Sequence, residues 1–258
     1  MDTNLIGFNN GVYDLNKGEF IYGRSDDSVG YDLPEYENGL ENEIFIELND
    51  FFESIYPDKD LREYVLTLFA NVLEGRNTNT KFYIFTGICS TGKSTIMELL
   101  SLMLGKYTCR PSHNLFTKSY KYVYHPILEL ESLRNKRLVV NEILDEVIID
   151  TDTMKSLFNY NPIPCHHLPL NFYIEFRPKF ILFFDSNNLS PKDPAIWRRA
   201  VKIDHLNRFV NDPKGENERK IDPYLQDKLP RYAQALMYLL LNKYYPIFKE
   251  KVTNSCGF

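Results

Sequence analysis

The chain has 258 residues, 43% hydrophobic and 25% charged, a composition typical of a globular protein rather than a disordered or fibrous one. Its longest apolar runs, at 180–184 and 235–241, are far shorter than a membrane-spanning helix, and no secretory signal opens the sequence, so we expect a soluble protein. The net charge of −5 argues against a protein that is basic over its whole surface.

The charge is unevenly distributed along the chain. Residues 1–75 hold 17 acidic and 4 basic side chains, a net charge of −13, which leaves +8 for the remaining residues. Such an asymmetry favours contact with a polyanion through one part of the molecule only, although an acidic surface can also serve solubility alone.

The four cysteines show no CxxC pair and no zinc-like spacing with histidine, which predicts reduced thiols in an intracellular protein. Three adjacent side chains could suggest a metal cluster, but neighbours in sequence cannot all turn toward one ion. These residues are Cys165, His166 and His167.

The first 75 residues predict a hairpin followed by helices. Asn9-Asn10-Gly11 lies between two short apolar pieces and is typical of a tight hairpin turn. Apolar residues then recur at helical spacing from Phe45 to Val72. We expect Pro57 to divide this region into two helices and Gly75 to end the second.

Short apolar runs predict buried parallel strands in the middle of the chain. They lie at 81–85, 137–142 and 179–185, and a helix at 95–104 ends at Gly105. A helical pattern returns at 221–250. The sequence thus predicts four segments: an N-terminal hairpin or extended part at 1–40, a small acidic helical subdomain at 41–76, an α/β core at 77–207, and a C-terminal helical segment at 208–258.

A phosphate-binding loop is the sharpest motif. It follows the first core strand, opens a helix and fits GxxxxGK[ST]. Backbone N–H groups of such a loop surround phosphates, Lys93 would contact the β and γ oxygens, and the Ser94 hydroxyl would bind Mg²⁺. The expected nucleotide-binding residues are Gly87, Ile88, Cys89, Ser90, Thr91, Gly92, Lys93, Ser94 and Thr95.

Three further positions fit nucleotide hydrolysis. Glu142 ends the second core strand, which we expect to lie beside the phosphate-loop strand. A carboxylate there can hold Mg²⁺ and polarise the attacking water, and Asp145 or Glu146 could share that role. Asn187 follows the third strand and could sense the γ-phosphate, with Asn188 as the alternative. Arg199, or else Arg198, could stabilise the transition-state charge from a neighbouring subunit.

The order of these motifs resembles that of superfamily 3 helicases, and more closely the poxvirus-type helicase–primases of large DNA viruses. Three further stretches carry the resemblance across nearly the whole chain. They are Phe8-Asn9-Asn10-Gly11-Val12-Tyr13-Asp14-Leu15, the block from Glu129-Leu130 through Lys136-Arg137 to Glu142, and Phe209-Val210-Asn211-Asp212-Pro213 with Asn217-Glu218 and Asp222.

The resemblance implies an AAA+-like P-loop NTPase fold, a parallel sheet flanked by helices with small helical parts at either end. It also implies ATP with Mg²⁺, a hexameric ring, movement on single-stranded or forked DNA, and a place in viral DNA replication in the cytoplasm of the infected cell. A primase domain or polymerase would be a further partner. A DNA-contacting hairpin would fall within 159–176, with Lys155, His166 and His167 as candidate DNA contacts.

The loop departs from the family pattern, which usually has Gly or Asn where this chain has Cys89-Ser90-Thr91, and Ser190 stands before Pro191. The primase domain is absent from these residues. Two other functions remain open from the sequence. One is an ATP-binding scaffold or DNA clamp, and the other is a monomeric P-loop kinase or NTPase, which lacks support from any guanine-reading or arginine-rich lid motif.

Overall fold

The computed structural model describes residues 3–23, 32–33, 35, 37, 40–75, 80–112, 115–117, 130–143, 150–158, 163–167, 170–174, 178–184 and 194–255. The chain divides into two compact units, each made of separated stretches of sequence. The first comprises Met1–Gly75, Ser90–Lys106 and Leu206–Phe258, and the second comprises Arg76–Cys89 and Tyr107–His205. This grouping cuts across the four consecutive segments expected from the sequence, which stay a prediction as domain bounds.

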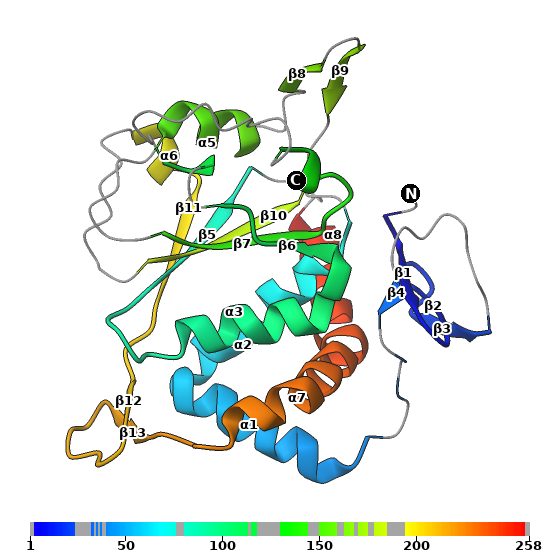
Figure 1. The fold of residues 1–258 in the computed structure, drawn as a ribbon. Helices are drawn as coiled ribbons and strands as arrows, with labels where there is room; N and C mark the ends of the chain where they lie inside the picture. The colour runs from blue at the N-terminus through cyan, green and yellow to red at the C-terminus, as the bar shows by residue number, and fades with distance from the viewer. Residues whose placement is uncertain are drawn as a thin grey trace. The chain divides into compact units, whose positions relative to one another are not determined.

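The second unit is built on a five-stranded sheet in which every neighbouring pair is parallel (Figure 1). The order is β11-β5-β10-β7-β6. All residues of β5 and β10 are buried, as expected for parallel strands that are covered on both faces. The strands are β5 (Phe82–Thr86), β6 (Thr108–Cys109), β7 (Leu138–Ile143), β10 (Lys179–Phe184) and β11 (Ala200–Asp204).

The three predicted core strands are confirmed within one residue at each end, but their spatial arrangement differs from the expectation. The sequence suggested that the strand ending in Glu142 lies beside the phosphate-loop strand. Instead β10 lies between them, and its residue Phe183 pairs with Phe85 on one side and with Glu142 on the other. Parallel strands are joined by long crossovers, so their order along the chain does not give their order in the sheet.

Aromatic packing holds helix α5 (Thr151–Phe158) on one face of this sheet. Phe158 stacks on Phe82 with ring centroids 4.1 Å apart and meets Phe180 edge-on at 5.0 Å. Ile196 of the short helix α6 (Pro194–Trp197) joins the same buried cluster. Figure 1 shows α5 and α6 together on that side of the strands.

An antiparallel hairpin links β7 to β10 in sequence. It consists of β8 (Ile163–His167) and β9 (Leu170–Ile174), with Ile163 opposite Ile174 and His167 opposite Leu170. The hairpin expected within 159–176 is therefore confirmed as a structural element.

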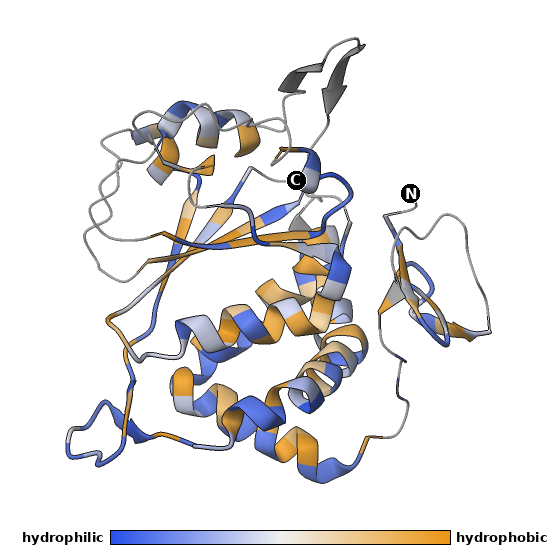
Figure 2. Cartoon of the chain, in the orientation of Figure 1, coloured by the Kyte–Doolittle hydropathy of each residue, from blue (hydrophilic) through white to orange (hydrophobic). Residues whose placement is uncertain are grey.

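The first unit contains the helices. Pro57 separates α1 (Asn42–Ile55) from α2 (Lys59–Val72), and the Asp58 side chain caps α2 by accepting from the Leu61 N–H at 2.7 Å. Helix α3 (Lys93–Leu104) packs against α7 (Leu225–Leu239), which also contacts α1. A π-helical turn (Leu240–Tyr244) leads from α7 into α8 (Tyr245–Ser255). Figure 2 shows that helices α1 and α7 contain both hydrophobic and hydrophilic residues, as expected for amphipathic helices.

The N-terminal hairpin is confirmed, with Leu5 opposite Asp14 and Phe8 opposite Gly11. It belongs to a larger sheet of order β3-β2-β1-β4 that the sequence did not reveal. Its strands are β1 (Leu5–Phe8), β2 (Gly11–Asp14), β3 (Glu19–Tyr22) and β4 (Asp32–Leu33). Gly11 is required there because a Cβ would lie 2.3 Å from the Ile21 carbonyl oxygen.

Two other expectations need correction. Helix α2 ends at Val72, and Gly75 lies beyond it, where its N–H donates to the Thr3 carbonyl at 3.1 Å. The C-terminal segment begins with a short parallel pair, β12 (Arg208–Val210) and β13 (Glu218–Lys220), rather than with helix. Within the described part of the chain, no helix is long and apolar enough to cross a membrane.

Candidate nucleotide-binding site

The predicted phosphate loop has the strand–loop–helix setting that the motif requires. Strand β5 ends at Thr86, the loop begins at Gly87, and α3 begins at Lys93 with Gly92 as its N-cap. Gly92 has a φ of 84°, in the left-handed region that glycine adopts without steric cost. The twelve-residue helix therefore presents its free N–H groups and positive dipole end directly after the loop.

Ser90 takes the backbone conformation that glycine would adopt most easily. Its φ is 65°, which is uncommon for a residue with a Cβ. The Ser90 carbonyl accepts a hydrogen bond from the Phe209 N–H at 2.8 Å, so the segment containing β12 holds this turn in place. The loop thus accommodates the departure from the usual Gly or Asn by placing one serine in the left-handed region.

The expected phosphate-contacting side chains lie at the start of α3. Lys93 is only 4% exposed, and its Nζ donates to the Thr91 hydroxyl at 3.3 Å. The neighbouring Ser94 is exposed and Thr95 half-buried. An ammonium and two hydroxyls in the first helical turn fit an anionic ligand and a divalent cation, since hydroxyl and carboxylate oxygens are the donors that Mg²⁺ prefers.

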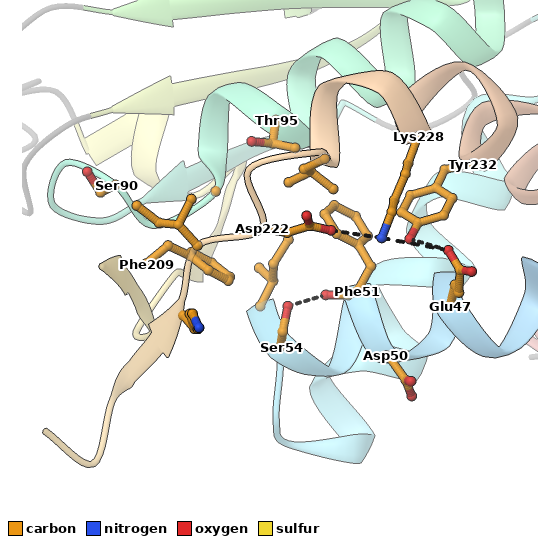
Figure 3. A pocket seen from close by; sticks show the side chains of 15 residues that line it. Glu47, Asp50, Phe51, Ser54, Ser90, Thr95, Phe209, Asp222, Lys228 and Tyr232 are labelled. Atoms are coloured by element: carbon orange, nitrogen blue, oxygen red, sulfur yellow. Dashed lines mark hydrogen bonds and ion pairs between the residues drawn. The ribbon is translucent and has the colours of Figure 1, made fainter. Parts of the chain in front are cut away.

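A pocket of about 460 Å³ in the first unit opens beside this loop (Figure 3). Ser90, Gly92 and Thr95 form its wall on the loop side. Much of the remaining wall is apolar, which suits a flat heterocycle next to phosphates. The apolar lining residues are Phe51, Ile55, Phe209, Ile221 and Leu225.

Four polar side chains form a connected group on another wall of the pocket, as Figure 3 shows. The Lys228 Nζ lies 2.9 Å from an Asp222 carboxylate oxygen and 4.0 Å from Glu47, which accepts from the Tyr232 hydroxyl at 3.1 Å. The hydrogen bond from Lys228 lowers the pKa of Asp222 and raises that of Lys228, while burial raises the pKa of Tyr232. Asp222 belongs to a stretch that carries the family resemblance, but no sequence pattern connected it with Glu47, Lys228 and Tyr232, because the four residues come from α1, from α7 and from the turn that precedes α7.

Glu142 lies near the carboxyl end of the sheet, where the parallel strands finish. Glu142 pairs with Phe183 of β10, and Phe183 pairs with Phe85 of β5, one residue before β5 ends. Its side chain is half-buried, whereas the neighbouring Asn141 is buried and donates its Nδ2–H to the Pro111 carbonyl. The structure therefore puts Glu142 near the end of the sheet from which the phosphate loop leaves. The alternatives Asp145 and Glu146 lie outside the described residues.

The predicted sensor, Asn187 or Asn188, also lies outside the described residues. The preceding strand β10 ends at Phe184, which pairs with both Thr86 and Ile143.

The arginine pair occupies the opposite end of the sheet. Arg199 directly precedes β11, whose first residue, Ala200, pairs with Phe82. Arg198 is exposed, while Arg199 is half-buried and its Nη1 donates to the Ala195 carbonyl at 2.8 Å. Phe82 lies four residues, or about 13 Å of strand, before Thr86, the last residue of β5. Within this sheet, the arginines and the start of the phosphate loop therefore lie at opposite ends.

One polar contact beside the loop was missed by sequence reasoning. Thr86, the last residue of β5, donates its hydroxyl to the carboxylate of Asp204, the last residue of β11. Partial burial alone would raise the pKa of Asp204, but the hydrogen bonds from Thr86 and Lys202 outweigh it and lower that pKa. Motif-based reasoning could not single out Asp204, because it forms part of no known phosphate-loop motif.

The candidate DNA contacts belong to two elements of the second unit. Lys155 is half-buried on α5, with its Nζ 3.7 Å from Asp152. His166 and His167 belong to β8, opposite Asn171 and Leu170. None of the described residues forms a cluster of three metal-binding side chains.

Comparison with known proteins relates the chain to viral proteins with helicase names. It is 32% identical over 262 residues to "Putative helicase" of Acanthamoeba polyphaga mimivirus, covering 95% of this chain and 27% of that protein. "Putative helicase 184R" of Invertebrate iridescent virus 6 is 26% identical, with 88% of this chain and 25% of that protein covered. The chain therefore spans about a quarter of the length of the curated relatives it matches.

A solved structure supports the fold class. The apo C-terminal region of NrS-1 superposes with a TM-score of 0.56 at 15% identity, over 81% of this chain and 47% of that one. At this identity the likeness concerns the fold alone, an α/β architecture with a five-stranded parallel sheet flanked by helices. No family model matches the sequence.

Proposed function

We propose that this chain is the ATP-driven motor portion of a viral DNA helicase of superfamily 3, related to the poxvirus-type helicase–primases, which acts as a ring on single-stranded or forked DNA. One observation carries the proposal. The phosphate loop and Glu142 belong to the carboxyl end of one parallel sheet, whereas Arg198 and Arg199 lie at its amino end. A complete hydrolytic site then needs a second copy of the chain, as a head-to-tail ring supplies.

In this proposal, the loop and the start of α3 hold the phosphates of ATP, and Lys93 supplies positive charge to them. The pocket lined by Phe209 and Ile55 would take the nucleoside. Ser94 and Glu142 would provide oxygen ligands, directly or through water, for Mg²⁺, which when bound neutralises charge on the phosphates. Glu142 would also orient the attacking water, with Asn187 beside the γ-phosphate.

The comparisons support the helicase assignment through the names of the relatives, which come from large DNA viruses. A role in viral replication in the infected cell's cytoplasm, a hexameric ring, contact with DNA through Lys155, His166 and His167, and a primase or polymerase partner all belong to the same proposal. The chain covers only part of each relative, so any primase activity would lie in other regions of such a protein.

The decisive experiment measures the ATP hydrolysis rate per subunit against protein concentration, with and without single-stranded DNA. We expect the rate to rise with protein concentration, because a higher concentration assembles the ring, and to rise when single-stranded DNA is added, because DNA stimulates hydrolysis. Lys93→Ala should abolish nucleotide binding, whereas Glu142→Gln should bind ATP and hydrolyse it at least about 100-fold more slowly. A rate independent of concentration and DNA would indicate a monomeric P-loop enzyme, and ATP binding without turnover would indicate a scaffold.

A further inference from the structure

Strand β11 is tied to the phosphate-loop strand at both of its ends. At the amino end, the Phe82 N–H donates to the Arg199 carbonyl at 3.1 Å. At the carboxyl end, the His205 N–H donates to the Thr86 carbonyl at 2.7 Å, and the Thr86 hydroxyl donates to Asp204. The five residue pairs between Ala200 and Asp204 run in register with β5.

This strand is also the outer strand of the sheet. In the order β11-β5-β10-β7-β6, β5 is the one strand of the described residues to which it bonds, so β5 sets its position within the sheet. A hydrogen-bonded pair of extended strands is stiff along its length because every residue is constrained by the ladder. A displacement of β5 at Thr86 is therefore shared by β11, and β11 leads directly back to Arg199.

The contact at the carboxyl end joins a buried hydroxyl to a carboxylate. Thr86 is fully buried, and it directly precedes Gly87, the first residue of the loop. Asp204 accepts from its hydroxyl and lies 2.9 Å from the Lys202 ammonium. With its pKa lowered, Asp204 is ionised at neutral pH, which makes the Thr86 contact charge-assisted.

We infer that the Thr86–Asp204 contact and strand β11 connect the phosphate loop of each chain to the arginine pair of the same chain, and that Asp204 is a positioning residue for the hydrolysis proposed above. The inference rests on the proposed function. In a head-to-tail ring, those arginines serve the neighbour's site, so the nucleotide bound by one subunit would adjust catalysis in the next.

Four variants separate this role from plain structural support. Thr86→Val keeps the shape of the side chain but removes the donor, and Thr86→Ser restores the donor. Asp204→Ala removes the acceptor, and Asp204→Asn keeps an acceptor oxygen without the charge. Amide hydrogen exchange of β10, which is covered on both faces, reports whether each variant is folded.

The experiment measures amide exchange of residues 199–205 with and without a non-hydrolysable ATP analogue and Mg²⁺, together with the Kd of the analogue and the Hill coefficient for ATP hydrolysis. In the wild type, the analogue should slow exchange in 199–205. In Thr86→Val and Asp204→Ala, the Kd should stay within about threefold, while protection disappears, kcat falls about tenfold and the Hill coefficient approaches 1. Thr86→Ser should show the protection, kcat and Hill coefficient of the wild type. Asp204→Asn should give values between those of the wild type and those of Asp204→Ala.

Analogue binding that leaves exchange in 199–205 unchanged in the folded wild type would overturn the inference and leave the proposed function standing. The inference also fails if Thr86→Val and Asp204→Ala, with β10 protected, keep the wild-type protection, kcat and Hill coefficient. A folded wild type that binds no analogue would instead refute the proposed function, and the inference with it.

Discussion

The backbone N–H of Phe82 donates to the carbonyl oxygen of Arg199 at 3.1 Å. Phe82 is the first residue of β5, and the phosphate loop follows the last residue of the same strand. The hydrogen bond therefore holds Arg199 beside the beginning of β5. The two ends of that strand lie about 13 Å apart, because each residue of a strand advances roughly 3.3 Å. Arg199 therefore lies at the end of β5 opposite to the one from which the phosphate loop leaves. If the site is shared between subunits, two defective chains should be able to complement each other.

Mixing two inactive variants should restore ATP hydrolysis. Arg199→Ala alone should lower kcat by about 10³-fold or more, the usual contribution of an arginine supplied in trans, and Lys93→Ala should be inactive because it cannot hold phosphate. In an equimolar mixture, some sites combine an intact loop from one variant with an intact arginine from the other. Random head-to-tail assembly would give roughly a quarter of the wild-type sites. The measurement is the hydrolysis rate across mixing ratios.

Arg198→Ala is the matched comparison, because the two arginines are adjacent and Arg198 is the more exposed. If Arg198 acts in place of Arg199, only the Arg198 variant will show complementation with Lys93→Ala. Mixtures that remain as inactive as the separate variants, for both arginines, would contradict catalysis in trans.

Substitutions at Ser90 and Gly92 should have different effects on stability although the two residues are only two positions apart. Both have positive φ, but only Ser90 bears a Cβ in that conformation. Ser90→Gly should leave the midpoint of thermal unfolding unchanged or slightly higher, since relief of strain offsets the added freedom of the unfolded chain. Gly92→Ala should lower unfolding stability by about 1–3 kcal/mol, because its Cβ would also meet Ile55 at 3.3 Å.

Thermal unfolding of both variants without nucleotide checks this prediction, and binding of an ATP analogue adds a second readout. Ser90→Gly should bind with wild-type affinity, whereas Gly92→Ala should bind more weakly because the loop cannot keep its turn. Equal destabilisation by the two substitutions would show that backbone strain does not distinguish these positions.

The sequence predicted the elements that depend on local chemistry. Buried apolar runs indicated the core strands, and the helix that follows the phosphate loop ends at Gly105 as expected, with a φ of 47°. Pro57 divides α1 from α2, since a proline disfavours helical conformation in the residue before it. Such features are fixed by residues close together in the chain, so a single sequence is enough to find them.

Long-range pairing was not predictable in the same way. Nothing local indicates that β10 separates β5 from β7, or that Gly75 bonds back to Thr3 instead of ending a helix. The pocket wall of Glu47, Asp222 and Lys228 likewise joins residues that are about 180 positions apart. Of the candidate site, the phosphate loop could be recognised in the sequence because it is one continuous motif, whereas Asp204 and the pocket depend on tertiary contacts.

The stacked aromatic core of the second unit should be more sensitive to substitution than any exposed aromatic residue. Phe158 is 1% exposed and packs on both Phe82 and Phe180. Phe158→Ala should lower the free energy of unfolding by about 3–5 kcal/mol, through lost burial and the cavity left behind. Tyr224→Ala is the control, because Tyr224 is 68% exposed and its loss should change stability by at most about 0.5 kcal/mol.

Urea unfolding followed by circular dichroism measures both variants. A Phe158→Ala midpoint within error of the Tyr224→Ala midpoint would mean that α5 does not pack on the sheet as described. Nucleotide binding by the folded fraction should survive both substitutions, because neither residue lines the pocket.

The Asp222–Lys228 pair should stabilise the protein between acid and strongly alkaline pH and lose that effect at both extremes. Because Lys228 lowers the pKa of Asp222, the aspartate contributes stability above its unfolded pKa of about 3.9 and loses it as pH falls through the lower folded value. Because Asp222 raises the pKa of Lys228, the lysine contributes below its unfolded pKa of about 10.4 and loses stability as pH rises through the higher folded value.

Lys228→Met tests this pair directly. The difference in thermal midpoint between wild type and variant should be constant from about pH 5 to pH 9, and it should shrink below about pH 4 and above about pH 10.4. Its size should be small and decrease with added salt, since both groups lie near solvent. Lys59→Met, at an exposed lysine of α2, controls for loss of a positive charge. Its difference in thermal midpoint from the wild type should not show this dependence on pH. A difference independent of pH in Lys228→Met would mean that the lysine acts through packing of its aliphatic stem and not through its charge.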